Sequence, residues 1–175
     1  GFYFYADDVY ANFDDTDPGW YVDDLLLETG PLPGFAVVDG FEEAGALDRW
    51  TTDHGVWEIG VPTWGPTTNA LGQRAYSGTN CLATLLGRNY YDNTWSRISS
   101  PRFVVPDAGL NPRLRFWHWW SFSYGDVGQV QISTNNGVDW QVLSDSYGEN
   151  GTGFNYHSGG RWTQAWLDLT RYAGQ

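Results

Sequence analysis

The chain has 175 residues, which is enough for one β-sandwich with a full core. It carries 21 acidic residues against nine basic ones, for a net charge of −12, and all nine basic residues are arginines. This balance argues against binding to nucleic acid or to anionic membrane surfaces, because both need cationic protein surface. No stretch is long and apolar enough to insert into a membrane.

Short strand-like segments recur along the chain, separated by turns rich in Gly and Pro. The expected strands span residues 1–5, 20–27, 35–38, 55–60, 81–86, 95–99, 114–122, 129–133, 140–143 and 162–169. An extended stretch at 102–105 and one helical turn within 44–50 complete the prediction. Asn136-Gly137 between two alternating runs predicts a hairpin. Many short strands without long helices favour an all-β sandwich or barrel.

Aromatic residues make up 18% of the chain, so much of this surface must be buried or must bind something. Strand alternation places Trp117 and Trp119 on one face and Trp120 on the other, with His118 opposite its two neighbours. One face is therefore core, and the other is either exposed or covered by a neighbour. Both a subunit interface and a sugar-stacking platform remain open. The candidate ligand or interface aromatics are Trp64, Trp117, Trp119, Trp120, Tyr124 and Trp162.

An acidic loop near the start of the chain is a candidate metal site, because hard cations prefer carboxylate oxygens. The alternative is that these acids are solvated turn residues. The loop's candidate ligands are Asp7, Asp8, Asp14, Asp15 and Asp17.

Catalytic chemistry has no support in the sequence. The three histidines, His54, His118 and His157, lack zinc-site spacing, and no Gly-x-Ser-x-Gly elbow occurs. No carboxylate pair is marked as special for glycoside hydrolysis. Cys81 is the only cysteine, lies in an apolar run and is predicted to be buried. We therefore expect no enzyme activity.

The order of several motifs resembles one known module. Gly40-Phe41-Glu42 is followed by Ala75-Tyr76-Ser77-Gly78, then by the aromatic run Phe116-Trp117-His118-Trp119, and finally by Tyr172-Ala173-Gly174. This order is similar to that of the MAM-like jelly-roll modules of immune inhibitor A-type secreted proteases and tandem-repeat surface proteins. The resemblance implies a jelly-roll β-sandwich of two antiparallel sheets and an extracellular or cell-surface location.

The resemblance also implies a structural Ca²⁺. In related jelly rolls the ion is held by the Glu of the Phe-Glu motif, an Asp of the closing Asp-Asp pair and oxygens near the Ser-Gly turn. These positions correspond here to Glu42, to Asp23 or Asp24, and to Ser77. Because strand alternation lets only one of two adjacent residues face a given site, we favour Asp23.

The motif order is circularly shifted relative to the family. Residues 1–30 read as the closing strands of a module, and residues 31–175 read as a module that lacks them. The closing strands belong to a preceding copy, complete their own sandwich, or insert into a neighbouring subunit. The residues expected to fill the gap are Phe2, Phe4, Trp20, Val22 and Leu25.

Two functions follow from this interpretation. The first is a non-enzymatic repeating unit of an extracellular filament or surface protein, assembled with copies of itself or adjacent repeats through shared or exchanged strands and stabilised by Ca²⁺. The alternative is an accessory module of a secreted hydrolase that binds polysaccharide or another substrate. Neither function involves nucleic acid or membrane insertion.

Overall fold

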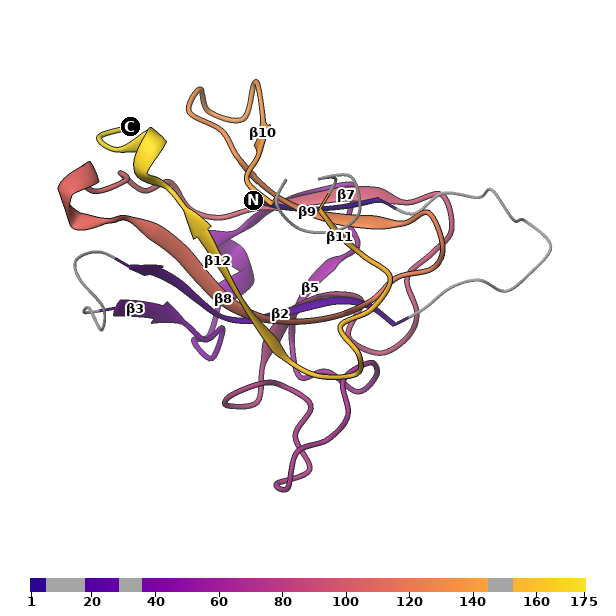
Figure 1. Ribbon diagram of the computed structural model, residues 1–175. Coiled ribbons are helices and arrows are strands. Elements are labelled where there is room, and N and C mark those ends of the chain that lie inside the picture. The colour runs from indigo at the N-terminus through magenta and orange to yellow at the C-terminus, as the bar shows by residue number, and fades with distance from the viewer. Residues whose placement is uncertain (6–17, 29–35, 145–152) are drawn as a thin grey trace.

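The computed structural model describes residues 1–5, 18–28, 36–144 and 153–175, and within them the protein is a sandwich of two antiparallel sheets (Figure 1). One sheet has the strand order β10-β9-β1-β7-β4, with β11 also paired to β9. The other has the order β12-β8-β2-β6-β5, with β3 also paired to β2. This architecture confirms the predicted all-β sandwich.

The elements are short, as the turn-rich sequence predicts. The strands are β1 (Phe2–Tyr5), β2 (Gly19–Glu28), β3 (Ala36–Asp39), β4 (Thr51–Asp53), β5 (Trp57–Gly60), β6 (Cys81–Thr84), β7 (Trp95–Ser99), β8 (Arg113–Ser121), β9 (Val127–Ile132), β10 (Gln141–Val142), β11 (Phe154–Asn155) and β12 (Thr163–Asp168). One helical turn, α1 (Ala46–Arg49), lies between β3 and β4. The 3₁₀ turns Ala108–Leu110 and Thr170–Tyr172 precede β8 and follow β12.

Two strands were not expected, and one extended segment is not a strand. β4 and β11 were missed because three and two residues are too short to show an apolar alternation. Residues 102–105 lie outside the sheets, although Val105 is buried. The predicted hairpin at Asn136-Gly137 is confirmed, since Gln141 of β10 pairs with Ile132 of β9.

The first two strands occupy inner positions in the two sheets. β1 lies between β7 and β9, and β2 lies between β6 and β8. The strands on either side of them come from the remainder of the same chain. In Figure 1, β1 and β2 are the indigo strands inside the two layers. The side chains of Phe2, Phe4, Trp20 and Val22 are fully buried, and Leu25 packs against the same core.

Aromatic rings from both sheets meet in this core. The ring of Phe2 lies edge-on to those of Trp20 and Phe116, with centroid distances of 5.4 and 5.2 Å. Gly128 on β9 leaves room for the Trp20 ring, because a Cβ there would lie 2.8 Å from it. Burial of these large apolar surfaces is the main stabilising contribution to the fold.

A second, smaller cluster covers the outer face of the β12-β8-β2-β6-β5 sheet. Tyr21, Cys81, Ala83 and Trp119 are buried there against Ala75 from the loop between β5 and β6. That loop therefore shields part of the sheet that would otherwise face solvent, and Cys81 is buried as predicted.

Candidate functional site

The turn at residues 77–80 is held by an acidic side chain from a distant part of the chain. Glu42 Oε1 accepts hydrogen bonds from the backbone N–H groups of Thr79 and Asn80, at 2.8 and 2.7 Å. Its Oε2 accepts from the Thr79 hydroxyl at 2.9 Å. Although desolvation acts in the opposite direction, these donors lower the pKa of Glu42. The carboxylate therefore acts as a clamp on the turn.

Gly78 is required at the centre of this clamp. Its φ of +59° lies in the left-handed region, and an added Cβ would lie 2.3 Å from Glu42 Oε1. A larger residue would be strained and would push the carboxylate away.

Both members of the Asp23-Asp24 pair reach the same turn. Asp23 Oδ2 accepts from the Ser77 N–H at 3.1 Å, and Asp24 Oδ1 accepts from the Ser77 hydroxyl at 2.5 Å. Strand alternation had led us to expect only one of them there. The alternation breaks down here because β2 shifts register between Asp23 and Leu26, and Asp24 adopts a φ of +47°.

Asp23 is a fully buried carboxyl group. Its burial, and secondarily the Asp24 carboxylate, raises its pKa to about 7, although backbone N–H donors such as that of Ser77 act in the opposite direction. Among the described residues, no arginine forms an ion pair with it. A cation at this position would favour the ionised form.

Glu42, Asp23, Asp24 and Ser77, which the resemblance selected, thus surround one turn. The Asp23-Asp24 pair holds one end of the turn, and Glu42 holds the other. In the described part of the chain, no three His, Cys, Asp or Glu side chains converge as a metal site. Asp7 and Asp8, and likewise Asp14, Asp15 and Asp17, lie outside the described residues.

The candidate aromatics do not form one platform. Trp119 is buried, Trp120 packs against the main core, and Trp117 stacks on Tyr76 with a centroid distance of 4.1 Å. The outer face of β8 is thus covered by a loop of its own chain, an arrangement that was not among those expected. Trp162 donates from Nε1 to the Arg74 carbonyl in the same layer, whereas Trp64 and Tyr124 are exposed.

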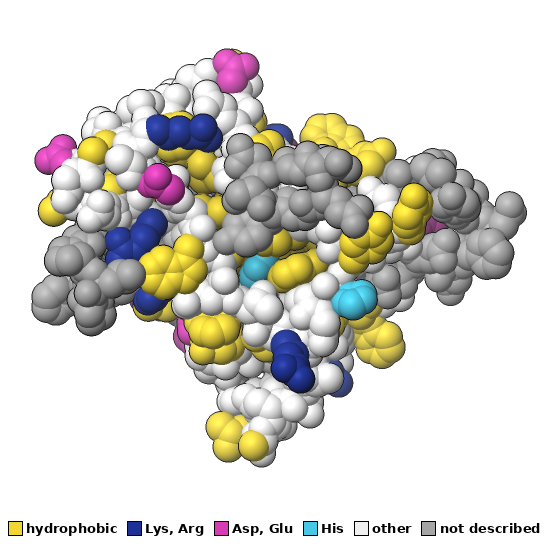
Figure 2. Space-filling view, viewed as in Figure 1, with side chains coloured by type: hydrophobic (Ala, Val, Ile, Leu, Met, Phe, Trp, Pro, Cys, Tyr) yellow, Lys and Arg dark blue, Asp and Glu magenta, His cyan; other side chains and the backbone are white. Residues whose placement is uncertain are grey.

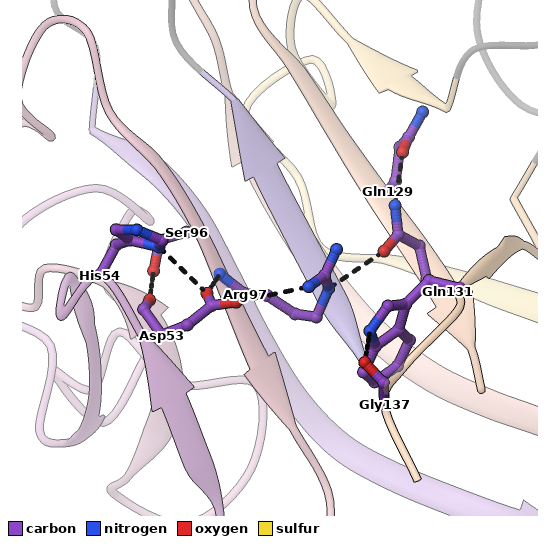
Figure 3. Close-up of polar contacts among 8 residues, drawn as sticks. Asp53, His54, Ser96, Arg97, Gln129, Gln131 and Gly137 are labelled. Carbon is purple, nitrogen blue, oxygen red and sulfur yellow. Dashed lines mark hydrogen bonds and ion pairs between the residues drawn. The ribbon is translucent and has the colours of Figure 1, made fainter. Parts of the chain in front are cut away.

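A polar network on the outer face of the other sheet was not predicted. Arg97 on β7 bonds to Asp53 on β4 and to Gln131 on β9, as Figure 3 shows. Its guanidinium lies between the rings of Tyr3 and Trp140, 5.4 and 4.6 Å from their centroids. The strand register that aligns these residues was not visible in the sequence. Because the arginine bonds to side chains on two other strands and packs against two rings, we interpret the network as a structural link across the sheet.

A pocket of about 460 Å³ lies between the loop after β5 and the loop after β6. Trp64 forms one wall, and the segment from Gly87 to Asp92 forms the other. Trp64 Nε1 donates to Asn89 Oδ1 at 2.6 Å, which joins the two walls. Sequence reasoning selected Trp64 but not its partners, because they lie about 25 positions away in a second loop.

On the face of the molecule that Figure 2 shows, the apolar side chains lie in separate groups among polar atoms. None of the helices in the described residues has the length and apolar character that a membrane span requires.

The chain is similar to one segment of a much longer protein, Bacillopeptidase F of Bacillus subtilis (strain 168). The two are 30% identical over 120 residues, which cover 68% of this chain and 7% of that protein. No family model matches the chain, so the MAM-like resemblance stays a prediction. No solved structure matches it either.

Proposed function

We propose that this domain is a non-catalytic accessory module of a secreted hydrolase, stabilised by Ca²⁺ and acting outside the cell. The carrying observation is the match to a small segment of Bacillopeptidase F, a secreted protease. A domain-sized segment that recurs in a long protease is typical of an appended module, and a β-sandwich with its own core suits that role.

The acidic turn supports the Ca²⁺ part of the proposal. Asp23 is buried without a cationic partner among the described residues, and Asp24, Ser77 and Glu42 add oxygens around the same turn. Carboxylate and hydroxyl oxygens are the ligands that Ca²⁺ prefers. Binding would draw Glu42 and the Asp23-Asp24 pair, which hold opposite ends of the turn, toward one ion. When bound, the ion would supply positive charge, and these residues would hold the turn against β2.

The test is thermal unfolding of the domain with Ca²⁺ and after exhaustive chelation. An ion that binds only the folded state raises the melting temperature. We expect Ca²⁺ to stabilise the wild type and the matched control Glu43→Gln, whose exposed carboxylate is the sequence neighbour of Glu42. We expect Glu42→Gln and Asp23→Asn to lose that response. A wild-type melting temperature that is independent of Ca²⁺ would remove the ion from the proposal.

The non-catalytic part is tested separately. The purified domain should release no peptides from casein. Proteolysis that co-purifies with the domain and is lost on a single substitution within it would contradict the accessory role.

A filament subunit is the second candidate, and it requires a neighbouring copy to supply β1 and β2, which here lie inside the sheets of their own chain. The contacts that these strands make within one chain would be the same if a neighbouring copy donated them. Such exchange predicts polymers of the purified chain, which sedimentation measurements detect.

A further inference from the structure

We propose that the pocket between Trp64 and Tyr91 binds an uncharged sugar ring of a polysaccharide. The inference deepens the proposed function, on which it rests, by giving the accessory module a ligand class and a binding site. It stands on the shape, exposure and chemistry of the pocket.

The pocket is a shallow, open depression lined by exposed aromatic surface. Its volume of about 460 Å³ lies in the range of small-molecule sites. Trp64 and Tyr91 are 48% and 47% exposed, although both are large apolar side chains. Partly exposed aromatic rings suit the apolar faces of sugar rings, which bury C–H groups while their hydroxyls stay at the rim. The Arg88 guanidinium covers one face of the Tyr91 ring, so a sugar would stack on its other face.

The rim supplies both donors and acceptors. The Arg88 guanidinium lies 5.0 Å from the Tyr91 ring centroid and offers N–H donors, and Asp92 offers carboxylate oxygens. One cation and one anion balance each other, so the lining favours an uncharged ligand rich in hydroxyls. The net charge of −12 also disfavours polyanions.

Both walls are anchored before any ligand arrives. The backbone N–H groups of Thr63 and Trp64 both donate to the Leu86 carbonyl, at 2.8 and 3.1 Å. On the opposite wall, Tyr90 is buried, its hydroxyl donates to Asp126, and its ring lies edge-on to Phe4 of β1. Asn89 fixes the Trp64 indole. Preorganised walls lower the entropic cost of binding.

The test is native affinity electrophoresis in gels that contain laminarin, hydroxyethylcellulose, soluble starch or xyloglucan. We expect retardation of the wild type by at least one of these uncharged polysaccharides. Trp64→Ala and Tyr91→Ala should each weaken the apparent affinity at least about tenfold, because each removes a stacking face. Trp64→Phe, which keeps a ring but loses the bond to Asn89, should lose less.

Trp95→Ala is the matched control, since Trp95 is 45% exposed and lies on the outer face of the other sheet. It should bind as the wild type does. Fluorine NMR of the wild type labelled with 5-fluorotryptophan reports ligand binding at Trp64 directly, so the test does not depend on an alanine variant that folds. The Trp64 signal, assigned through Trp64→Phe, should shift on addition of the retarding polysaccharide, and the Trp95 signal should not.

The inference fails if none of the four gels retards the domain, or if Trp64→Ala and Tyr91→Ala leave the retardation unchanged. It also fails if the Trp64 fluorine signal does not move with an uncharged polysaccharide and moves only with a proline-rich peptide or with the polyanion alginate, which serve as alternative ligands. A domain that binds no polysaccharide but keeps its Ca²⁺-dependent melting temperature would refute the sugar site and leave the accessory module standing. Casein cleavage by the domain would refute the accessory module itself.

Discussion

Gly78 shows how one residue positions the acidic turn. Its missing side chain leaves room for the Glu42 carboxylate, and its positive φ bends the chain so that the N–H groups of Thr79 and Asn80 point toward that carboxylate. The same turn presents Ser77 to Asp23 and Asp24. The arrangement of the candidate Ca²⁺ ligands thus depends on a residue with no functional group.

We expect Gly78→Ala to destabilise the domain more than Gly72→Ala. Both positions have positive φ, and so share the same backbone penalty, but a Cβ at Gly72 has no atom within 4 Å. The additional cost of displacing Glu42 from its donors is about 1–3 kcal/mol. Urea unfolding measures the difference.

The background variant Glu42→Ala tests the cause. There the two glycine substitutions should cost equal free energy, because no carboxylate is left to displace. A difference between them that persists without Glu42 would show that the turn is strained for another reason.

At the level of elements, β2 and β8 are joined by a polar contact inside the apolar core. Trp20 Nε1 on β2 donates to His118 Nδ1 on β8 at 3.4 Å. The bond requires an unprotonated Nδ1, and burial lowers the pKa of His118 to about 3. His118 is therefore a structural histidine, and its neutral form helps to join the two strands.

This contact predicts a loss of stability in acid. The unfolded state takes up a proton near the ordinary histidine pKa of about 6.5, whereas the folded state does so only near pH 3. The contribution of His118 to the unfolding free energy should therefore fall by about 1.4 kcal/mol per pH unit as the pH drops from about 6 toward 3. Urea unfolding of the wild type and His118→Gln at several pH values measures it.

The raised pKa of Asp23 has the opposite sign, because its contribution is lost as the pH rises from about 4 toward 7. Subtracting the His118→Gln curve from the wild-type curve removes this contribution. Parallel curves for the two proteins would contradict the assigned role of His118.

Sequence patterns predicted the elements better than the site. The alternation of Phe2 and Phe4, and that of Trp20 and Val22, predicted buried strands because burial on one face leaves a period of two. The bulge at Asp24 left no such signal, since a register shift depends on how the neighbouring strands pair. The pocket was equally invisible, because Trp64 meets Asn89 only once both loops are folded.

At the scale of the whole molecule, the central question is how the sandwich is closed. β1 and β2 bury their side chains in the core of their own chain and pair with strands on both sides. Strands with both edges paired leave no inner edge open to a neighbouring copy. We therefore expect a module closed in this way to fold as a unit.

Sedimentation velocity of the purified domain over a wide range of concentrations tests this closure most directly. We predict one species with the mass of a single chain, unchanged by dilution and by Ca²⁺. Polymers that grow with concentration, and that disappear when residues 1–28 are supplied only as a separate peptide, would contradict the self-closed module and establish strand exchange between copies.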